Sequence, residues 1–253
     1  MEATQPARKP RVKLWRVAVL LCLVMFGLWF LSVVGTHIMV WRYARAESAY
    51  PGADIMPQSL PDKRIANLSN GTNISAFGFS FRVPWPKVAF RNDGKSFVFT
   101  KFESGAIVSV WDQSQTPIGP GIPAGASNSQ TEDMNRFFGR KAVASRYGYF
   151  KAMMDASPRD ISFFHPRANG KAMVLLALKS IHVQKATAVY LVASTSVQGY
   201  QIGDPEKLPK AIQLILFDAK DREYCLILHG TTGPGALTQE SINAIVASFQ
   251  PPQ

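Results

Sequence analysis

Ile212-Gln213-Leu214-Ile215-Leu216-Phe217 is an apolar run that leads into Asp218-Ala219-Lys220-Asp221-Arg222, and a second apolar run follows from Tyr224 to Leu228. Two such runs on either side of a short polar segment are typical of strands joined by a hairpin loop. Another run rich in β-branched and aliphatic residues, from Thr187 to Ala193, precedes them. The C-terminal third of the chain is therefore predicted to be mainly β-sheet.

Further strands are expected upstream of this region. In Phe77-Gly78-Phe79-Ser80-Phe81-Arg82-Val83, apolar residues alternate with small or polar ones, and Pro84-Trp85-Pro86 ends the run. This alternation predicts a strand that is buried on one face. The runs 96–102 and 106–111 are separated by Glu103-Ser104-Gly105, a spacing that suits a second hairpin.

Helices are expected where apolar residues recur at helical spacing. A surface loop is predicted over Gln115 to Gln130, and a capping box at Ser129-Gln130-Thr131-Glu132 begins the first helix. A second helix is predicted from Gly170 to about His182. Thr238 can cap a third, terminal helix. The supporting residues are Met134, Phe137 and Phe138, then Tyr147, Phe150 and Met154, then Met173, Leu176, Ala177 and Ile181, and finally Ile242, Ile245, Val246 and Phe249. This order of strands, helices, strands and a helix predicts an α+β domain over residues 76–253, in which helices cover an antiparallel sheet.

The two ends of this domain resemble the PsbP-like family. Phe77-Gly78-Phe79-Ser80-Phe81-Arg82-Val83-Pro84-Trp85 is similar to the family's opening strand, and Ile242-Asn243-Ala244-Ile245-Val246-Ala247-Ser248-Phe249 is similar to its closing helix. The middle, from Ser129 to Ser180, departs from the pattern. The resemblance implies an α/β/α sandwich and a noncatalytic binding or assembly factor, and it implies no active-site residues.

A membrane-spanning helix is predicted over residues 17–41. From Val17 to Val40 there is no Asp, Glu, Lys or Arg, and Trp15 and Trp41 bracket the run. As a helix at ~1.5 Å per residue it is about 36 Å long, enough to cross a hydrocarbon core of roughly 30 Å. Tryptophans are enriched at the two membrane interfaces. Membrane lipid is therefore an expected partner of residues 17–41.

The flanking charges predict the orientation of this helix. Only Arg42 and Arg45 follow the span before Glu47. The tail 1–16 carries five basic residues, which are Arg8, Lys9, Arg11, Lys13 and Arg16. The positive-inside rule then places the N-terminus in the cytoplasm and the C-terminal domain outside it, in a periplasm or on the cell surface. The first 45 residues carry +6 of the net +11, so the basic character belongs largely to the anchor and we expect no nucleic-acid partner.

Two processing alternatives compete with a retained anchor. Ala44-Arg45-Ala46 has the small-x-small pattern of a signal-peptidase site, so cleavage after Ala46 is one alternative, although the apolar run is longer than a secretory signal needs. Lipidation at Cys22 is the other, but Leu21 stands where a small residue is required and the apolar run continues past Cys22.

Residues 42–75 are predicted to form a spacer rich in Pro, Gly, Asn and Ser. Three N-x-S/T sequons lie within it, at Asn67, Asn70 and Asn73. In a host with oligosaccharyltransferase these asparagines would be candidates for glycosylation on the extracytoplasmic side. The sequence itself leaves their occupancy open.

Catalytic, cofactor-binding and metal-binding residues are not predicted. The four histidines, which are His37, His165, His182 and His229, lack the close spacing of a zinc motif, and Cys225 lies in an apolar run without a nearby base. We expect a noncatalytic binding or assembly module for a partner protein or envelope component, with Trp85 or Trp111 as candidate surface anchors. The alternative is a membrane-tethered hydrolase whose site is assembled from sequence-distant residues, with His165 or His229 as the residues to test.

Overall fold

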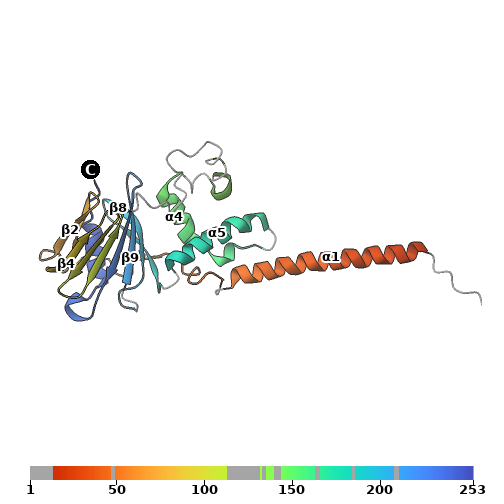
Figure 1. Cartoon of the computed structure of the whole chain (residues 1–253), viewed down its shortest axis with the longest axis horizontal. Helices are drawn as coiled ribbons and strands as arrows, with labels where there is room; N and C mark the ends of the chain where they lie inside the picture. The colour runs from red at the N-terminus through yellow and green to blue at the C-terminus, as the bar shows by residue number, and fades with distance from the viewer. Residues whose placement is uncertain are drawn as a thin grey trace, which may run out of the picture.

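The computed structural model describes residues 14–46, 49–112, 132, 135–139, 144–162, 166–183, 186–207 and 211–252. A long N-terminal helix, α1 (Leu14–Arg45), extends away from an α+β domain built on a β-sheet (Figure 1). The fold class predicted from the order of the elements is therefore confirmed at this level.

Helix α1 contains the only candidate membrane span among the described residues. Trp15–Tyr43 has a mean hydropathy of 2.8 over its most apolar window, and none of that window is buried against the rest of the protein. The span predicted over residues 17–41 lies within it. By length and composition, α1 is able to cross a membrane.

The main sheet has eight strands in the order β1-β7-β8-β9-β10-β6-β5-β4. Their bounds are β1 (Gln58–Ser59), β4 (Val88–Asp93), β5 (Phe97–Phe102), β6 (Ile107–Trp111), β7 (Val189–Ala193), β8 (Val197–Ile202), β9 (Ala211–Asp218) and β10 (Glu223–His229). All neighbouring pairs are antiparallel except β1 with β7, which is parallel. The expectation of an antiparallel sheet is thus corrected to a mixed one.

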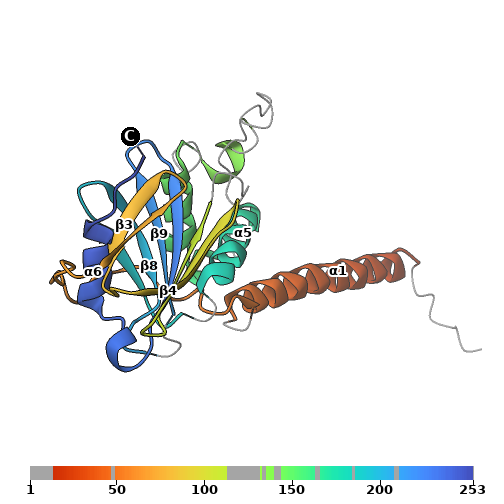
Figure 2. The same cartoon turned by 60° about the vertical axis from the view of Figure 1, so that its left-hand side comes forward.

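Helices lie on both faces of this sheet. On one face, α4 (Arg146–Asp155) and α5 (Pro166–Val183) bury a cluster that includes Phe150 and Leu176 against β8 and β9. On the other, α6 (Gln239–Ala247) packs with a separate hairpin of β2 (Thr72–Ala76) and β3 (Phe79–Val83). Figure 2 shows α6 and β3 on one side of β8 and β9, with α5 on the other. Two short 3-10 helices, Pro158–Asp160 and Gly233–Gly235, and a helical stretch over residues 135–138 are also described.

Several local predictions are confirmed. Thr238 caps α6 by accepting a hydrogen bond from the backbone N–H of Ser241, and the predicted hairpin of residues 212–228 is β9 and β10. The strand expected from Phe77 begins instead at Phe79, because Phe77 and Gly78 have positive φ angles of 48° and 83° and form the turn after β2. The capping residues Ser129 to Thr131 and the loop predicted over Gln115 to Gln130 lie outside the described residues.

The region predicted as a spacer differs from expectation in the structure. Residues 42–75 supply β1 and most of β2, and Ala53 and Leu68 are buried. The Ala66 N–H donates to the Glu240 carbonyl of α6. Much of this segment is therefore packed onto the domain. Its few apolar residues contact the domain, which the Pro- and Gly-rich composition did not indicate. Asn67, Asn70 and Asn73 are exposed.

Candidate functional site

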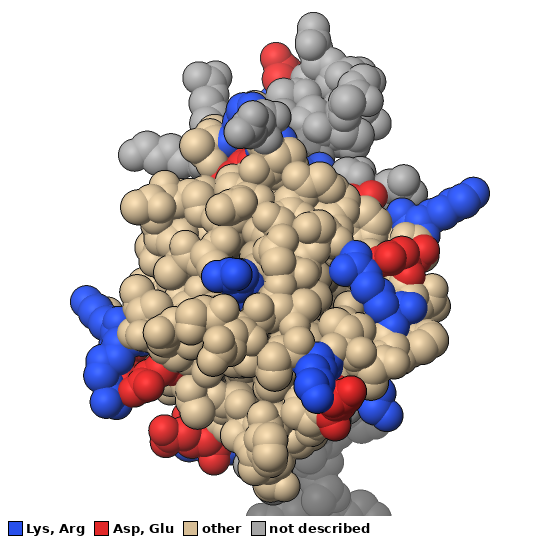
Figure 3. Space-filling model, turned by 90° about the vertical axis from the view of Figure 1, so that its left-hand side faces the viewer, with Lys and Arg blue, Asp and Glu red and all other residues tan. Residues whose placement is uncertain are grey.

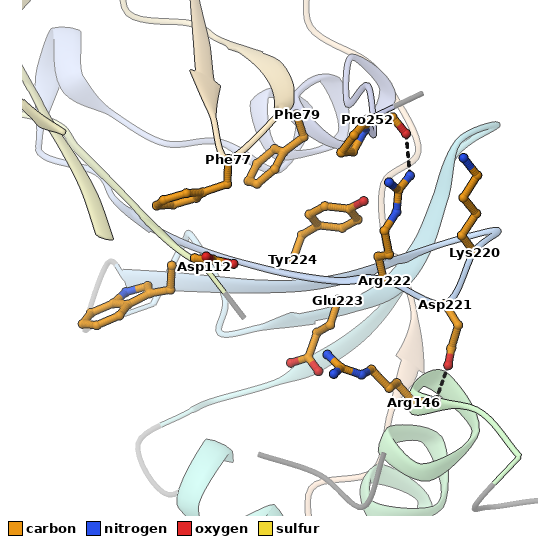
Figure 4. A pocket seen from close by; sticks show the side chains of 11 residues that line it. Phe77, Phe79, Asp112, Arg146, Lys220, Asp221, Arg222, Glu223, Tyr224 and Pro252 are labelled. Atoms are coloured by element: carbon orange, nitrogen blue, oxygen red, sulfur yellow. Dashed lines mark hydrogen bonds between the residues drawn. The ribbon is translucent and has the colours of Figure 1, made fainter. Parts of the chain in front are cut away.

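A hollow with converging charged groups lies at the turn between β9 and β10, and we call it the hairpin-end pocket (Figure 4). Its volume is about 710 Å³. It combines residues from five separate parts of the chain: Phe77, Phe79, Trp111, Asp112, Arg146, Lys220, Asp221, Arg222, Glu223, Tyr224 and Pro252. Mixed apolar and charged walls of this kind are typical of ligand-binding clefts.

Aromatic rings form the apolar wall of the pocket. The Phe79 ring meets the Tyr224 ring edge-on, with centroids 4.9 Å apart, and stacks on Phe249 of the C-terminal segment at 5.1 Å. The positive φ at Phe77 sets its side chain beyond the end of β3, at the mouth of the pocket (Figure 4). The tilted ring of Trp111, at the end of β6, is 44% exposed. Flat apolar groups can therefore contact this wall.

Asp218 holds the hairpin turn in place. Its Oδ1 accepts hydrogen bonds from the backbone N–H groups of Lys220 and Arg222, and its Oδ2 accepts from Arg222 Nε at 2.6 Å and the Tyr224 hydroxyl at 2.8 Å. Burial alone would raise the pKa of Asp218, but the hydrogen bonds from Arg222 and Tyr224 outweigh it and the pKa is lowered. Asp218 is thus an ionised, buried anchor for the turn.

The same turn also fixes the start of α4. Asp221 adopts a left-handed backbone with φ of 61°. Its carboxylate accepts hydrogen bonds from the backbone N–H groups of Arg146 and Tyr147, which are the first two residues of α4. A carboxylate at this position satisfies free N–H groups and complements the helix dipole. This contact brings Arg146 to the wall of the pocket.

Glu223 and Arg146 make the electrostatic centre of the pocket. Figure 4 shows the Arg146 guanidinium turned toward the Glu223 carboxylate. Burial raises the pKa of Glu223 to about 7, while the charge of Arg146 acts in the opposite direction. Near neutral pH both the protonated and the ionised form of the Glu223 carboxyl group are therefore populated. Lys220 extends from the turn and has no ion pair with a described residue.

A second hollow, of about 560 Å³, lies between β7 and α6 and includes Leu191, Val246 and Lys63. Its lining is mainly apolar, and Lys63 is the only charged residue among those that form it. It lacks the converging charged groups of the hairpin-end pocket, which is why the latter is the candidate site.

The residues considered from the sequence take different places in the structure. Trp111 reaches the hairpin-end pocket, whereas Trp85 is buried in the core and Cys225 is buried in β10. His229 is exposed at the end of β10, and His165 lies outside the described residues. Sequence reasoning missed Glu223 and Arg146; a carboxylate at the start of an apolar run was the available signal for Glu223.

Among the residues that the structure describes, no group of three or more His, Cys, Asp and Glu side chains could hold a metal ion. Neither the His182 nor the His229 side chain forms a hydrogen bond with another described residue; the His182 ring instead packs on Phe150, with centroids 5.3 Å apart. The described part of the chain therefore offers no assembled nucleophile and base pair around these histidines.

Comparison with models of protein families, with curated proteins and with solved structures finds no match for this chain. The resemblance to the PsbP-like family stays a prediction from the two ends of the domain.

Proposed function

We propose that the chain is a single-pass, membrane-anchored and noncatalytic binding or assembly module. In this proposal α1 crosses the membrane through residues 17–41 and holds the N-terminus in the cytoplasm. The α+β domain lies on the extracytoplasmic side, in a periplasm or at the cell surface, and binds a partner protein or envelope component. Nucleic acid is not among its ligands.

The hairpin-end pocket carries this proposal. Its walls come from β2–β3, β6, α4, the β9–β10 turn and the C-terminus, so the fold holds one concave surface in place from several sides. Exposed Trp111 and the cation Arg146 are residue types that anchor protein contacts. The unburied apolar surface of α1 supports the anchor, because insertion into lipid would remove that surface from water.

Photo-crosslinking in native membranes tests the proposal. A photoreactive amino acid in place of Trp111 is expected to crosslink one defined partner, and the double variant Arg146→Glu/Lys220→Glu is expected to lose that crosslink. The same probe at Ile181, which is 68% exposed on α5, serves as the matched control and is expected to give none. Absence of a specific product at Trp111 would contradict the proposal.

Reporter tags at the two ends of the chain test the topology. An N-terminal tag is expected to react only after the membrane is permeabilised, and a C-terminal tag is expected to be accessible from outside. The reverse pattern would overturn the proposed orientation, and release of the domain into the soluble fraction would favour cleavage after Ala46.

We also propose that the domain is a PsbP-like sandwich. Helices on both faces of the sheet support this assignment, as do strand β3 and helix α6, which lie within the two stretches of sequence that carry the resemblance. An experimental structure of a family member could be compared with this domain in two features, the eight-stranded sheet and the short parallel strand β1.

One observation favours the second candidate, a membrane-tethered hydrolase. A carboxyl group with a pKa of about 7 in a pocket, beside an arginine, has the properties of a general acid or base. An activity screen of the full chain on ester, peptide and glycoside substrates tests it. Activity that Glu223→Gln abolishes would establish this role, whereas activity that follows His165→Ala or His229→Ala would place the site elsewhere.

A further inference from the structure

Strand β4 is a free edge of the main sheet. It ends the strand order, pairs only with β5 among the strands that the structure describes, and all six of its residues are exposed. It lies on the side of the domain opposite α1 (Figure 1). An open strand edge of this length presents unpaired backbone groups to which another extended chain can bind.

The pairing register shows which backbone groups are available. Gly94 N–H donates to the Phe97 carbonyl, so the hydrogen-bonded pairs between β4 and β5 are Gly94 with Phe97 and Asn92 with Phe99. The residues between them, Arg91 and Asp93, direct their N–H and C=O groups away from β5. These groups therefore face the open edge.

An aromatic stripe leads from this edge across the sheet. Its members are Phe90, Phe99, Phe97 and Trp111, and successive ring centroids are 6.3, 6.2 and 4.6 Å apart. Phe90 is 55% exposed and Trp111 44%. The register places these residues on the same face of β4, β5 and β6. An incoming strand can therefore gain apolar burial on this face as well as backbone hydrogen bonds.

The charges around β4 are mainly basic. Lys87, whose Nζ lies 3.7 Å from the exposed Glu103 carboxylate, precedes the strand and Lys95 follows it, while Lys101 lies opposite Phe90. Asp93 is held by Arg91 at 2.8 Å, and neither Lys95 nor Lys101 has an ion pair with a described residue. Figure 3, which looks onto the β2 and β4 side, shows a broad, mostly uncharged surface with a basic side chain near its middle, while most other Lys and Arg side chains lie toward its rim together with acidic ones.

We propose that β4 binds an extended, acid-flanked segment of a partner protein as an additional strand of the sheet. Acidic residues at the two ends of the segment lie near Lys87 and Lys95, and apolar residues at alternate positions face the aromatic stripe. A second copy of this chain is the poorer occupant, because full antiparallel overlap of two β4 strands brings Lys87 of one copy close to Lys95 of the other. Trp111 belongs to both the aromatic stripe and the hairpin-end pocket, but β4 itself shares no residue with the pocket.

Peptide binding to the full chain in phosphatidylcholine nanodiscs tests this inference. The probe is a synthetic peptide of six alternating Val and Tyr residues with two Glu at each end. Its first control has Lys in place of each Glu, and its second carries N-methyl groups on alternate residues. Measured by fluorescence anisotropy, the Glu-flanked probe is expected to bind about tenfold more tightly than either control. Equal binding of all three peptides would overturn the proposal, as would no binding of the probe up to about 1 mM.

Protein variants locate the binding site. Lys87→Glu/Lys95→Glu is expected to reverse the preference between the Glu- and Lys-flanked peptides, while Lys63→Glu, in the hollow between β7 and α6, leaves it unchanged. Hydrogen exchange is expected to slow at the amides of Arg91 and Asp93 when the probe binds. Unchanged exchange there would place the peptide elsewhere and overturn the inference. Concentration-dependent dimerisation that the probe inhibits would show that the occupant is a second copy, and would also overturn it.

Discussion

Lys179 joins α5 to the end of α4, since its Nζ donates a hydrogen bond to the Ala156 carbonyl oxygen at 2.7 Å although the residue is completely buried. The same nitrogen lies 3.7 Å from the sulfur of Met56, in the segment between α1 and β1. Arg45, at the end of α1, donates to the Pro158 carbonyl nearby. One buried amine therefore lies close to the place where α1, α4, α5 and the segment before β1 meet.

Lys179 is expected to make the stability of the domain increase with pH above pH 8. Burial lowers its pKa to about 8 from 10.5, so the folded state releases a proton that the unfolded state still holds between these values. The free energy of unfolding should rise over this interval by up to about 3 kcal/mol. Urea unfolding of the full chain in detergent at pH 8.0 to about 9.5 measures it; above that range the raised pKa values of Tyr200 and Tyr224 act in the opposite direction.

Lys179→Met is the test variant for this effect. It removes the buried cation while keeping a long, flexible side chain, and the increase in unfolding free energy between pH 8 and pH 9.5 should disappear. Lys151→Met, on the exposed side of α4, is the matched control and should keep the increase. An increase that persists in Lys179→Met would show that another group is responsible.

Glu223 is expected to produce the opposite dependence at lower pH. Its pKa is raised from 4.5 to about 7 by burial, so the folded state binds a proton more tightly than the unfolded state. The free energy of unfolding should therefore fall as the pH rises from 4.5 to 7. Glu223→Gln should remove this decrease.

Arg146→Gln should raise the pKa of Glu223 further, because the positive charge of Arg146 acts to lower it. NMR titration of the Glu223 carboxyl carbon measures the pKa directly, and an unchanged value in Arg146→Gln would contradict the proposed coupling.

Asp218→Asn is expected to destabilise the domain by about 2 to 4 kcal/mol, because the buried carboxylate accepts four hydrogen bonds and pairs with Arg222. The amide nitrogen of Asn cannot accept the bonds that Arg222 and Tyr224 donate to Oδ2. Asp93→Asn, on an exposed ion pair, should change the stability by less than about 0.5 kcal/mol. Chemical denaturation of both variants provides the comparison, and equal losses would show that burial of Asp218 has little energetic weight.

The sequence predicted those elements whose apolar pattern matches their burial. β9 and β10 bury continuous apolar residues and α6 buries helically spaced ones, so their sequence patterns predicted these elements and the Thr238 cap. β4 was missed because all of it is exposed and it has no alternation to detect. β8 was missed because Gly199 and the polar Gln201 interrupt it. Gln201 is nevertheless fully buried, since it exchanges hydrogen bonds of 2.8 Å with Gln239 of α6.

The candidate site was less predictable than the strands that support it. Arg146 and Glu223 are 77 positions apart in the sequence, and they meet because Asp221 binds the first N–H groups of α4. This contact depends on a left-handed backbone at Asp221, a conformation uncommon for a residue other than glycine. A local sequence pattern cannot indicate a cap from a residue so distant in the sequence, so the pocket becomes visible only in the folded chain.

Gly199 and Gly170 provide a contrasting pair of glycines for a last prediction. A Cβ added to Gly199 in β8 would overlap the Ile215 carbonyl oxygen of the paired strand β9, whereas one added to Gly170 in α5 meets no described atom closer than the Phe137 ring at 3.8 Å. Gly199→Ala must therefore separate β8 from β9 and should cost about 3 kcal/mol or more. Gly170→Ala should stabilise the chain by about 0.5 to 1 kcal/mol, because alanine loses less backbone entropy in a helix. Thermal unfolding of the full chain should lower the midpoint for the first variant and raise it for the second. If Gly199→Ala unfolds at the wild-type temperature, β8 and β9 do not approach as closely as the structure indicates.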